Sequence, residues 1–168
     1  MKLEIIPEAL NRLKNPPKEL NFIGDISLLS MPKVAVVGSR KASVYTKECV
    51  TALCAALKSA NVCVVSGGAI GVDITAHKAA MPRTIGVFAN GLDIIYPVQN
   101  KAAIREIYEK GLALSEYDEG EPPIAYRFLE RNRIVVGLAQ ALVVAQADLR
   151  SGSMQSARLA NELKIPLF

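Results

Sequence analysis

The sequence predicts an α/β protein with an open, doubly wound and mostly parallel sheet. Short aliphatic runs alternate along the chain with segments whose apolar residues recur at helical spacing. This alternation indicates βαβ units, because a crossover between parallel strands usually contains a helix. The aliphatic runs lack polar alternation, which is typical of strands that are covered on both faces. The length of 168 residues suits one domain.

The first half of the regular pattern begins at Lys33. Aliphatic runs that end in or near Gly predict strands at 34–38 (VAVVG), 62–68 (VCVVSGG) and 84–89 (TIGVFA). The segment 44–60 is predicted as a helix from four apolar residues at helical spacing, which are Val50, Leu53, Cys54 and Leu57. A second helix is expected at about 71–80.

The second half continues the same alternation. A helix is expected from about 100 to 110, followed by a strand at 112–116 (LALSE). The segment 127–138 (RFLERNRIVVGL) supplies the next helix, ALVVAQA (141–147) the fifth strand and 151–164 the last helix. IPLF (165–168) begins a sixth strand, so we expect the domain to continue past this point.

The N-terminal residues differ from this pattern. Residues 1–30 are expected to form a short helical or irregular lead-in, interrupted at NPPKEL and packed on the core. The remaining residues, 31–168, form the α/β domain.

Composition narrows the class of protein. The chain is 51% hydrophobic, and no apolar run reaches the ~18 residues of a membrane span. Its N-terminus is too charged for a signal peptide, so we expect a cytoplasmic protein without membrane contact. The net charge of +4 is compatible with a polyanionic partner. The cysteines Cys49, Cys54 and Cys63 match no zinc pattern and are interpreted as small core residues; neither a metal nor a cofactor is expected.

The loops after the strands are the candidate binding site, because open α/β sheets bind ligands outside the carboxyl ends of their strands. Four of the five loops carry Gly, and three carry Ser beside Gly; the loops are GSRKAS (38–43), SGGAIGVD (66–73), ANGLD (89–93), SEYDEGEPP (115–123) and QADLRSGS (146–153). Small residues let backbone N–H groups approach an anion, which predicts a phosphate-binding face. In any single loop, Gly could equally serve only the turn. Neither GxGxxG nor the Walker lysine motif is present.

Cationic side chains occur at two of these places. Arg40 and Lys41 follow the first predicted strand, where a guanidinium suits bidentate phosphate contact. Arg127 and Arg131 share a helix face, whereas Arg131 and Arg133 point to nearly opposite sides. We expect one arginine of the helix to bind phosphate and another to pair with an acid, such as Glu116 or Asp148.

Phe128 lies beside these arginines. An aromatic ring next to a cation suits single-stranded nucleic acid, in which a base stacks on the ring while a phosphate meets the arginine. The alternative is a purely structural contact of Phe128 with the apolar part of its helix.

Two groups could instead serve catalysis. His77 follows Asp73 by four residues, and Glu116 ends a predicted strand. A general base is conceivable for either group, but a structural hydrogen bond for His77 and an ion pair for Glu116 are the alternatives.

Six motifs, taken in order, resemble those of the DNA-processing protein DprA (Smf) family. They are VAVVGSR, VSGGAIGVDITAH, GVFANGLDIIYPVQN, ALSEY, RFLERNRIVVGLAQALVVAQA and SGSMQSARLANE. The lead-in segment NPPKELNFIGDISLL also resembles this family. The resemblance implies an extended Rossmann-like, non-enzymatic domain that binds single-stranded DNA. In the family, binding protects incoming DNA during natural transformation (competence) and helps load the recombinase RecA for homologous recombination. Family members are usually homodimers.

The resemblance also implies a set of DNA-binding residues. These are Gly38, Ser39, Arg40, Lys41, Ser66, Gly67, Gly68, Arg127, Phe128, Arg131, Asn132, Arg133, Ser151, Gly152 and Ser153. Ile70 departs from the family, which commonly has Arg there, and Arg127 could supply the basic residue that often precedes the Phe. The family domain normally continues past this endpoint, so surfaces for dimerisation and RecA contact could lie partly outside the sequence.

Two other functions remain open. Lysine-decarboxylase-like phosphoribohydrolases share this general shape and carry PGGxGTxxE, but the comparable loop here reads QADLRSGSMQSA, and Glu116 would have to supply the missing acid. A mononucleotide sensor without catalysis is the third possibility.

Overall fold

Six strands form the central sheet of the computed structural model, which describes residues 1–168. The strands are β1 (Asn21–Gly24), β2 (Lys33–Val37), β3 (Cys63–Ser66), β4 (Thr84–Phe88), β5 (Leu112–Ser115) and β6 (Ala141–Val144). Their order is β1-β5-β4-β3-β2-β6, and every pairing is parallel except that of β1 with β5. This confirms the predicted open and mostly parallel sheet.

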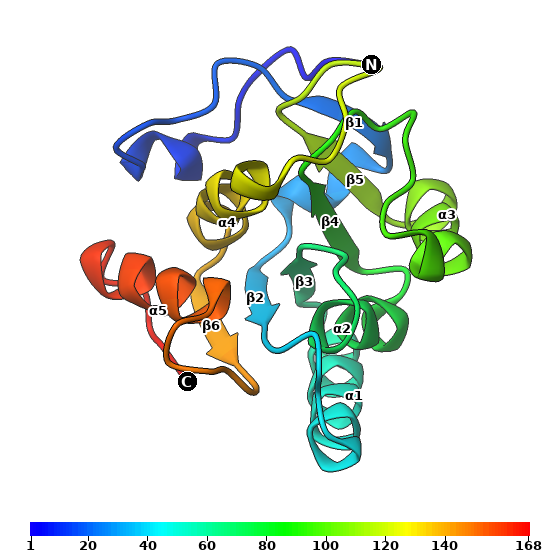
Figure 1. Cartoon of the computed structure of the whole chain (residues 1–168). Coiled ribbons are helices and arrows are strands. Elements are labelled where there is room, and N and C mark those ends of the chain that lie inside the picture. Colours follow the sequence, from blue (N-terminus) through cyan, green and yellow to red (C-terminus); the bar gives the residue numbers. More distant parts are fainter.

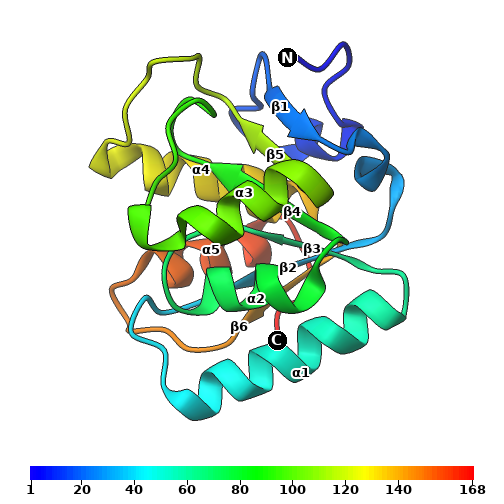
Figure 2. The same ribbon diagram turned by 90° about the vertical axis from the view of Figure 1, so that its right-hand side faces the viewer.

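Five α-helices cover the two faces of the sheet (Figure 1 and Figure 2). They are α1 (Val44–Ser59), α2 (Val72–Ala80), α3 (Lys101–Lys110), α4 (Ala125–Leu138) and α5 (Gly152–Glu162). The first three lie on one face, and α4 and α5 lie on the other. After β5 the chain returns along α4 and places β6 beside β2. The loops after β2 and β6 therefore diverge at a topological switch point, which is where open α/β sheets bind ligands.

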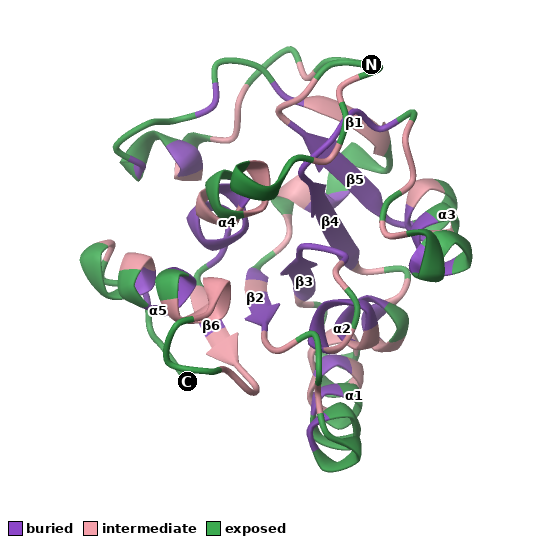
Figure 3. Ribbon diagram, in the orientation of Figure 1, coloured by how far each residue is buried: buried purple, intermediate pink, exposed green.

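Alternate residues of the strands point to opposite faces of the sheet and pack into a separate hydrophobic core on each face. Ala35 and Val37 pack in the cluster that includes Ile134 and Leu138 of α4, whereas Val36 packs with α1 and α2 on the opposite face. Figure 3 shows the inner strands β3, β4 and β5 buried and the edge strands β1 and β6 largely intermediate, while the outer faces of the helices are exposed. Burial on both sides explains why these strands show no polar alternation.

The lead-in contains a strand that its sequence pattern did not indicate. β1 pairs antiparallel with β5, with Phe22 opposite Leu114, between the 3₁₀ helices η1 (Glu8–Arg12) and η2 (Ile26–Ser30). Its residues lie outside the regular alternation of aliphatic runs and helices, and its pairing depends on a partner about ninety positions away. Leu10 and Leu13 of the lead-in lie in the main core cluster and would contact a Cβ at Gly137 of α4.

One cysteine differs from the prediction. Cys54 and Cys63 are buried, but Cys49 is exposed. The buried positions of α1 are Thr46, Val50 and Cys54. Cys49 precedes Val50 and is therefore turned by about 100° from that stripe.

The last residues lie beside β6. Leu167 forms an isolated parallel bridge with Leu142, and the Phe168 N–H donates to the Leu142 carbonyl at 2.9 Å. This agrees with the direction of the expected sixth parallel strand, although the pairing is a bridge and not a full strand. None of the helices is both long enough and apolar enough to span a membrane.

Candidate nucleic-acid interface

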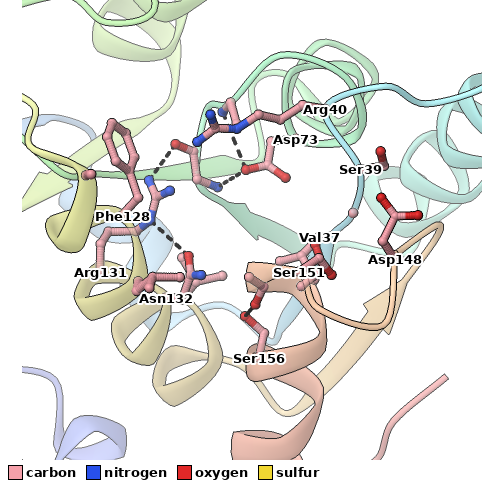
Figure 4. A pocket seen from close by; sticks show the side chains of 18 of the residues that line it. Val37, Ser39, Arg40, Asp73, Phe128, Arg131, Asn132, Asp148, Ser151 and Ser156 are labelled. Carbon is pink, nitrogen blue, oxygen red and sulfur yellow. Dashed lines mark hydrogen bonds between the residues drawn. The ribbon is translucent and has the colours of Figure 1, made fainter.

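A groove of about 740 Å³ opens at the carboxyl ends of β2 and β6 (Figure 4). It is lined by residues of the loops after β2, β3 and β6 and by α4 and α5. The predicted residues that line it are Gly38, Ser39, Arg40, Lys41, Gly67, Phe128, Arg131, Asn132, Ser151, Gly152 and Ser153. The structure thus brings eleven of the fifteen predicted residues together at one site.

The loop of residues 38–43, called here the first loop, forms one wall. A Cβ at Gly38 would lie 2.6 Å from Val72 Cγ2, so the close approach of the loop to α2 requires glycine. The Ser39 N–H donates to the Gln146 carbonyl at 2.7 Å, which ties the first loop to the segment after β6. Arg40 and Lys41 are exposed and form no ion pair within the protein, so both cations are free to meet an anion.

Arg131 lies on the floor of the groove and is only 5% exposed. Its Nη1 donates to the carbonyls of Gly67 and Val87, at 2.6 Å for Gly67, and its Nε donates to Asn132 Oδ1 at 3.2 Å. Figure 4 shows the side chain reaching from α4 toward the loop after β3. Nη2 makes no hydrogen bond within the protein. The floor therefore offers a desolvated cation with donor capacity left for a ligand.

Asp73 balances part of this charge. Its Oδ2 accepts from the N–H groups of Gly67 at 3.1 Å and Ala69 at 3.4 Å. Burial raises the pKa of Asp73, and the charge of Arg131 together with these hydrogen bonds opposes that rise. The Gly67 N–H, which the sequence suggested as a donor to phosphate, is thus already occupied by Asp73.

Ser66 and Gly68 do not line the groove. Ser66 is fully buried, and its Oγ donates to the Val36 carbonyl at 2.6 Å. Gly68 has a φ of +74°, and its carbonyl accepts from Asn100 Nδ2 at 3.0 Å. Both residues shape the turn after β3 from within the protein.

Phe128 stands on the wall of the groove between two cations. The guanidinium carbons of Arg40 and Arg131 lie 5.5 and 5.9 Å from its ring centroid. Tyr96 lies on the same wall, with its ring centroid 5.7 Å from that of Phe128. A side pocket of about 110 Å³ adjoins these four side chains. Rings and cations are therefore interleaved along one wall.

Arg127 and Arg133 both lie outside the groove. Arg127 forms an ion pair with Glu121 and stacks over Tyr117, 4.4 Å from its ring centroid. Arg133 pairs with Glu116 at 2.6 Å, which confirms the expectation that one arginine of α4 pairs with that acid. Of the three arginines on α4, only Arg131 faces the groove.

The loop after β6 forms the opposite wall. Ser151 caps α5 by accepting the Met154 N–H at 3.3 Å, and Gly152 and Ser153 open the helix. Their N–H groups belong to the first turn, which has no carbonyl partners within the helix and favours anions. Asp148 also lines the groove and is the one exposed acid there.

The two catalytic candidates have structural partners. His77 is fully buried, and its Nδ1 shares a hydrogen bond of 2.6 Å with Thr84 Oγ1. Burial, with a smaller effect from Arg131, lowers the pKa of His77 to about 3, so the ring is neutral. Glu116 is held by Arg133. No group of three or more His, Cys, Asp or Glu side chains is arranged to hold a metal ion.

Three residues of the site were not singled out from the sequence. Tyr96 lies seven residues after the predicted strand 84–89, Gln146 falls inside the predicted strand 141–147, and Asp73 was considered only with His77. Tyr96 could have been noticed as an aromatic shortly after the loop ANGLD. The contacts of Asp73 and Gln146 depend on tertiary packing and leave no signal in the sequence.

Comparison with known proteins identifies the family. The family model of DNA recombination-mediator protein A matches residues 2–168. The DNA processing protein DprA of Streptococcus pneumoniae is 41% identical over 93% of this chain and 56% of its own length. Protein Smf of Escherichia coli is 39% identical over 95% of this chain and 44% of its own length. The chain spans 34–56% of the length of the curated relatives it matches.

Solved structures agree with this assignment. DNA processing protein A of Helicobacter pylori, described for its single-stranded DNA binding mode, superposes with a TM-score of 0.98 at 47% identity, over 100% of this chain and 79% of that one. DprA of S. pneumoniae superposes with a TM-score of 0.95 at 38% identity, over 100% of this chain and 62% of that one. A molybdenum cofactor binding protein of Rippkaea orientalis shares the fold alone, with a TM-score of 0.59 at 16% identity over 81% of this chain and 74% of that one. This chain therefore belongs to the DNA recombination-mediator protein A family, the DprA (Smf) family that its motifs resemble.

Proposed function

We propose that this chain binds single-stranded DNA in the groove between the first loop and the start of α5. In this proposal it protects incoming DNA during natural transformation and assists the loading of the recombinase RecA. The observation that carries the proposal is Arg131, a buried guanidinium whose Nη2 has no partner in the protein and which lines the groove beside Phe128. A buried charge is costly unless it is paired, and a phosphate would complete this pairing.

The arrangement of the walls favours a single strand as the ligand. Arg40 and Lys41 on one wall and the first turn of α5 on the other can bind phosphates. Phe128 and Tyr96 offer ring surface on which unpaired bases can stack. Bases in a duplex are already stacked and paired, so rings of this kind serve a single strand better.

Binding without catalysis fits the polar groups better than the enzyme alternative does. The phosphoribohydrolase alternative needs Glu116 as its acid, but Glu116 is engaged by Arg133 and does not line the groove. His77 is buried and neutral, does not line the groove, and is bonded to Thr84. The relative from H. pylori, described for its single-stranded DNA binding mode, supports the same ligand.

The test is fluorescence anisotropy of a labelled oligo-dT titrated with the protein across a range of salt concentrations. If about four phosphates are neutralised, log K falls against log salt with a slope of about −3. Arg40→Ala is expected to weaken binding and to flatten the slope by ~0.7, the contribution of one phosphate on a single strand. Arg105→Ala, which removes an exposed arginine of α3 outside the groove, is the control and leaves both values unchanged.

Protection and RecA loading are tested with the same variants. Bound oligonucleotide is expected to resist a single-strand nuclease, and a bacterial RecA is expected to cover single-stranded DNA faster in the presence of the wild-type protein than with Arg40→Ala. Salt-independent affinity, or tighter saturable binding of a mononucleotide than of oligo-dT, would contradict the proposal and favour the mononucleotide sensor.

A further inference from the structure

We propose that Gln146 is a positioning residue for DNA binding, which holds the first loop so that Arg40 and Lys41 face the groove. This inference rests on the proposed function. Gln146 follows β6, on the other side of the switch point from the first loop, and does not itself line the groove. Its effect on a ligand must therefore pass through the loop that it holds.

The contacts of Gln146 span almost the whole first loop. Its carbonyl accepts from the Ser39 N–H at 2.7 Å. Its side-chain Oε1 accepts from the Ser43 N–H at 3.0 Å and from Thr46 Oγ1 at 2.9 Å, and its Nε2 donates to the Lys41 carbonyl at 3.4 Å. One residue thus binds the beginning, the middle and the end of the loop.

Other contacts hold the loop to α2 or within itself, and they do not join it to β6. The Ser39 carbonyl accepts from the Val72 N–H at 3.2 Å. The Lys41 N–H donates to Ser39 Oγ at 3.0 Å within the loop, and Ser43 Oγ accepts from the Thr46 N–H at 3.0 Å as the cap of α1. The side chains of Arg40 and Lys41 have no acidic partner in the protein. The Arg40 guanidinium lies over the Phe128 ring, but the loop backbone that carries both cations is joined to the segment after β6 by the hydrogen bonds of Gln146.

An amide side chain suits this role chemically. The loop presents one donor at Ser43 and one acceptor at Lys41, and an amide carries both an acceptor and a donor. It also carries no charge. A carboxylate at the same position would add a negative charge close to the cations that are proposed to bind phosphate.

The chain provides a matched control at the opposite end of the same strand. Gln140 precedes β6, and its Oε1 accepts from the Lys33 N–H at 2.6 Å. This bond ties β6 to β2 at the edge of the sheet away from the groove. Gln140→Met and Gln146→Met therefore remove the same kind of side chain from the two ends of one strand pair.

The experiment compares the wild type, Gln146→Met and Gln140→Met. Gln146→Met is expected to weaken oligo-dT binding about tenfold and to flatten the salt slope by ~0.7–1.4, because one or two cations lose their alignment with phosphate. Gln140→Met is expected to retain the wild-type affinity and slope. In the double variant Gln146→Met/Arg40→Ala, the loss is expected to be smaller than the sum of the two single losses, because both act on the same loop.

Amide hydrogen exchange tests the positioning itself without DNA. Gln146→Met is expected to speed exchange at Ser43 at least tenfold, whereas Gln146→Glu, which keeps the acceptor, retains most of that protection. Wild-type-like binding by Gln146→Met, or equal losses in Gln146→Met and Gln140→Met, would overturn the inference while leaving the proposed function intact. If the wild type does not bind oligo-dT at all, the proposed function fails, and unchanged exchange at Ser43 would separately reject the role of Gln146 in holding the loop.

Discussion

The arginine side chains of α4 lie in different environments and have different partners. Arg131 is buried and bonded to the carbonyls of Gly67 and Val87, whereas Arg133 is paired with Glu116 outside the groove. Side chains that are two residues apart on a helix point to nearly opposite sides. This spacing alone predicts that Arg131 and Arg133 cannot bind the same ligand. Which of the two faces the groove depends on how α4 packs on the sheet.

Asp148 is the residue whose removal is expected to improve binding. It is an exposed acid on a groove proposed to hold phosphates, so it repels the ligand. Asp148→Asn is expected to tighten oligo-dT binding about threefold at low salt, and the gain should fade at high salt as the charges are screened. The control is Glu162→Gln at the far end of α5, which lies outside the groove. Equal effects of both variants would mean that only net charge matters.

His77 is expected to make stability depend on pH. Its pKa is about 3 in the folded protein, where burial disfavours the cation, and 6.5 without that burial. The unfolded chain therefore binds a proton between these values that the folded chain does not, and stability falls as the pH drops. From pH 6.5 to pH 5 this contributes a loss of ~1–2 kcal/mol. Urea unfolding of the wild type and His77→Gln at several pH values should show a flatter dependence in the variant; identical slopes would contradict the assignment.

The sequence located most of the groove but not its internal contacts. Glycine and serine after aliphatic runs predicted five loops at the groove, because strand ends of a parallel sheet share an edge. The loops after β2, β3 and β6 line it, whereas the loop 89–93 does not and the loop 115–123 contributes only Pro123. The family resemblance implied Ser66 as a further DNA-binding residue, although its side chain is buried and donates to the Val36 carbonyl. The direction in which a side chain points at the end of a strand follows from the register of that strand, which the sequence does not show.

At the scale of elements, α4 connects the groove with the lead-in. Its first turns carry Phe128 and Arg131, and its last turns are buried against Leu10 and Leu13. Arg12 of the lead-in donates to the carbonyls of Gly137 at 2.8 Å and Ala139 at 2.6 Å, at the C-terminal end of the helix. A cation there satisfies open carbonyls and is favoured by the helix dipole.

Removal of this cap is expected to weaken folding without a direct effect on the groove. Arg12→Met should lower the free energy of unfolding by ~1–2 kcal/mol, the worth of two hydrogen bonds to a charged group at a helix end. Lys14→Met, which removes an exposed cation of the same segment, is the control and should change it little. Chemical denaturation measures both. Oligo-dT affinity of Arg12→Met at a temperature where it is fully folded should equal that of the wild type; a large loss would show that the lead-in also positions α4.

The elements between residues 33 and 164 were predicted within a few residues, and the strand of the lead-in was not. The strong alternation between 33 and 164 gave every helix and parallel strand of the domain. β1 lacks such a pattern because its four residues derive their conformation from pairing with β5. Cys49 illustrates the same limit, since an apolar neighbourhood in sequence did not place it on the buried stripe of α1.

For the whole molecule, the strand order explains why distant segments form one site. β6 returns beside β2 after the chain has crossed to the other edge of the sheet, so loops separated by about a hundred residues meet at the switch point. Helices of both faces begin there as well, which brings the start of α5 opposite the first loop. The groove is thus a product of topology more than of any single motif.

If the groove binds DNA as proposed, occupancy of the guanidinium on its floor would also lengthen the lifetime of the folded chain. A ligand that binds only the folded protein stabilises it by about 2.7 kcal/mol when its free concentration is a hundred times the dissociation constant. Protease susceptibility through global unfolding would fall by about a hundredfold under these conditions. Copies of the protein that hold DNA would then outlast empty copies in a proteolytic environment, and turnover would remove the unoccupied molecules first.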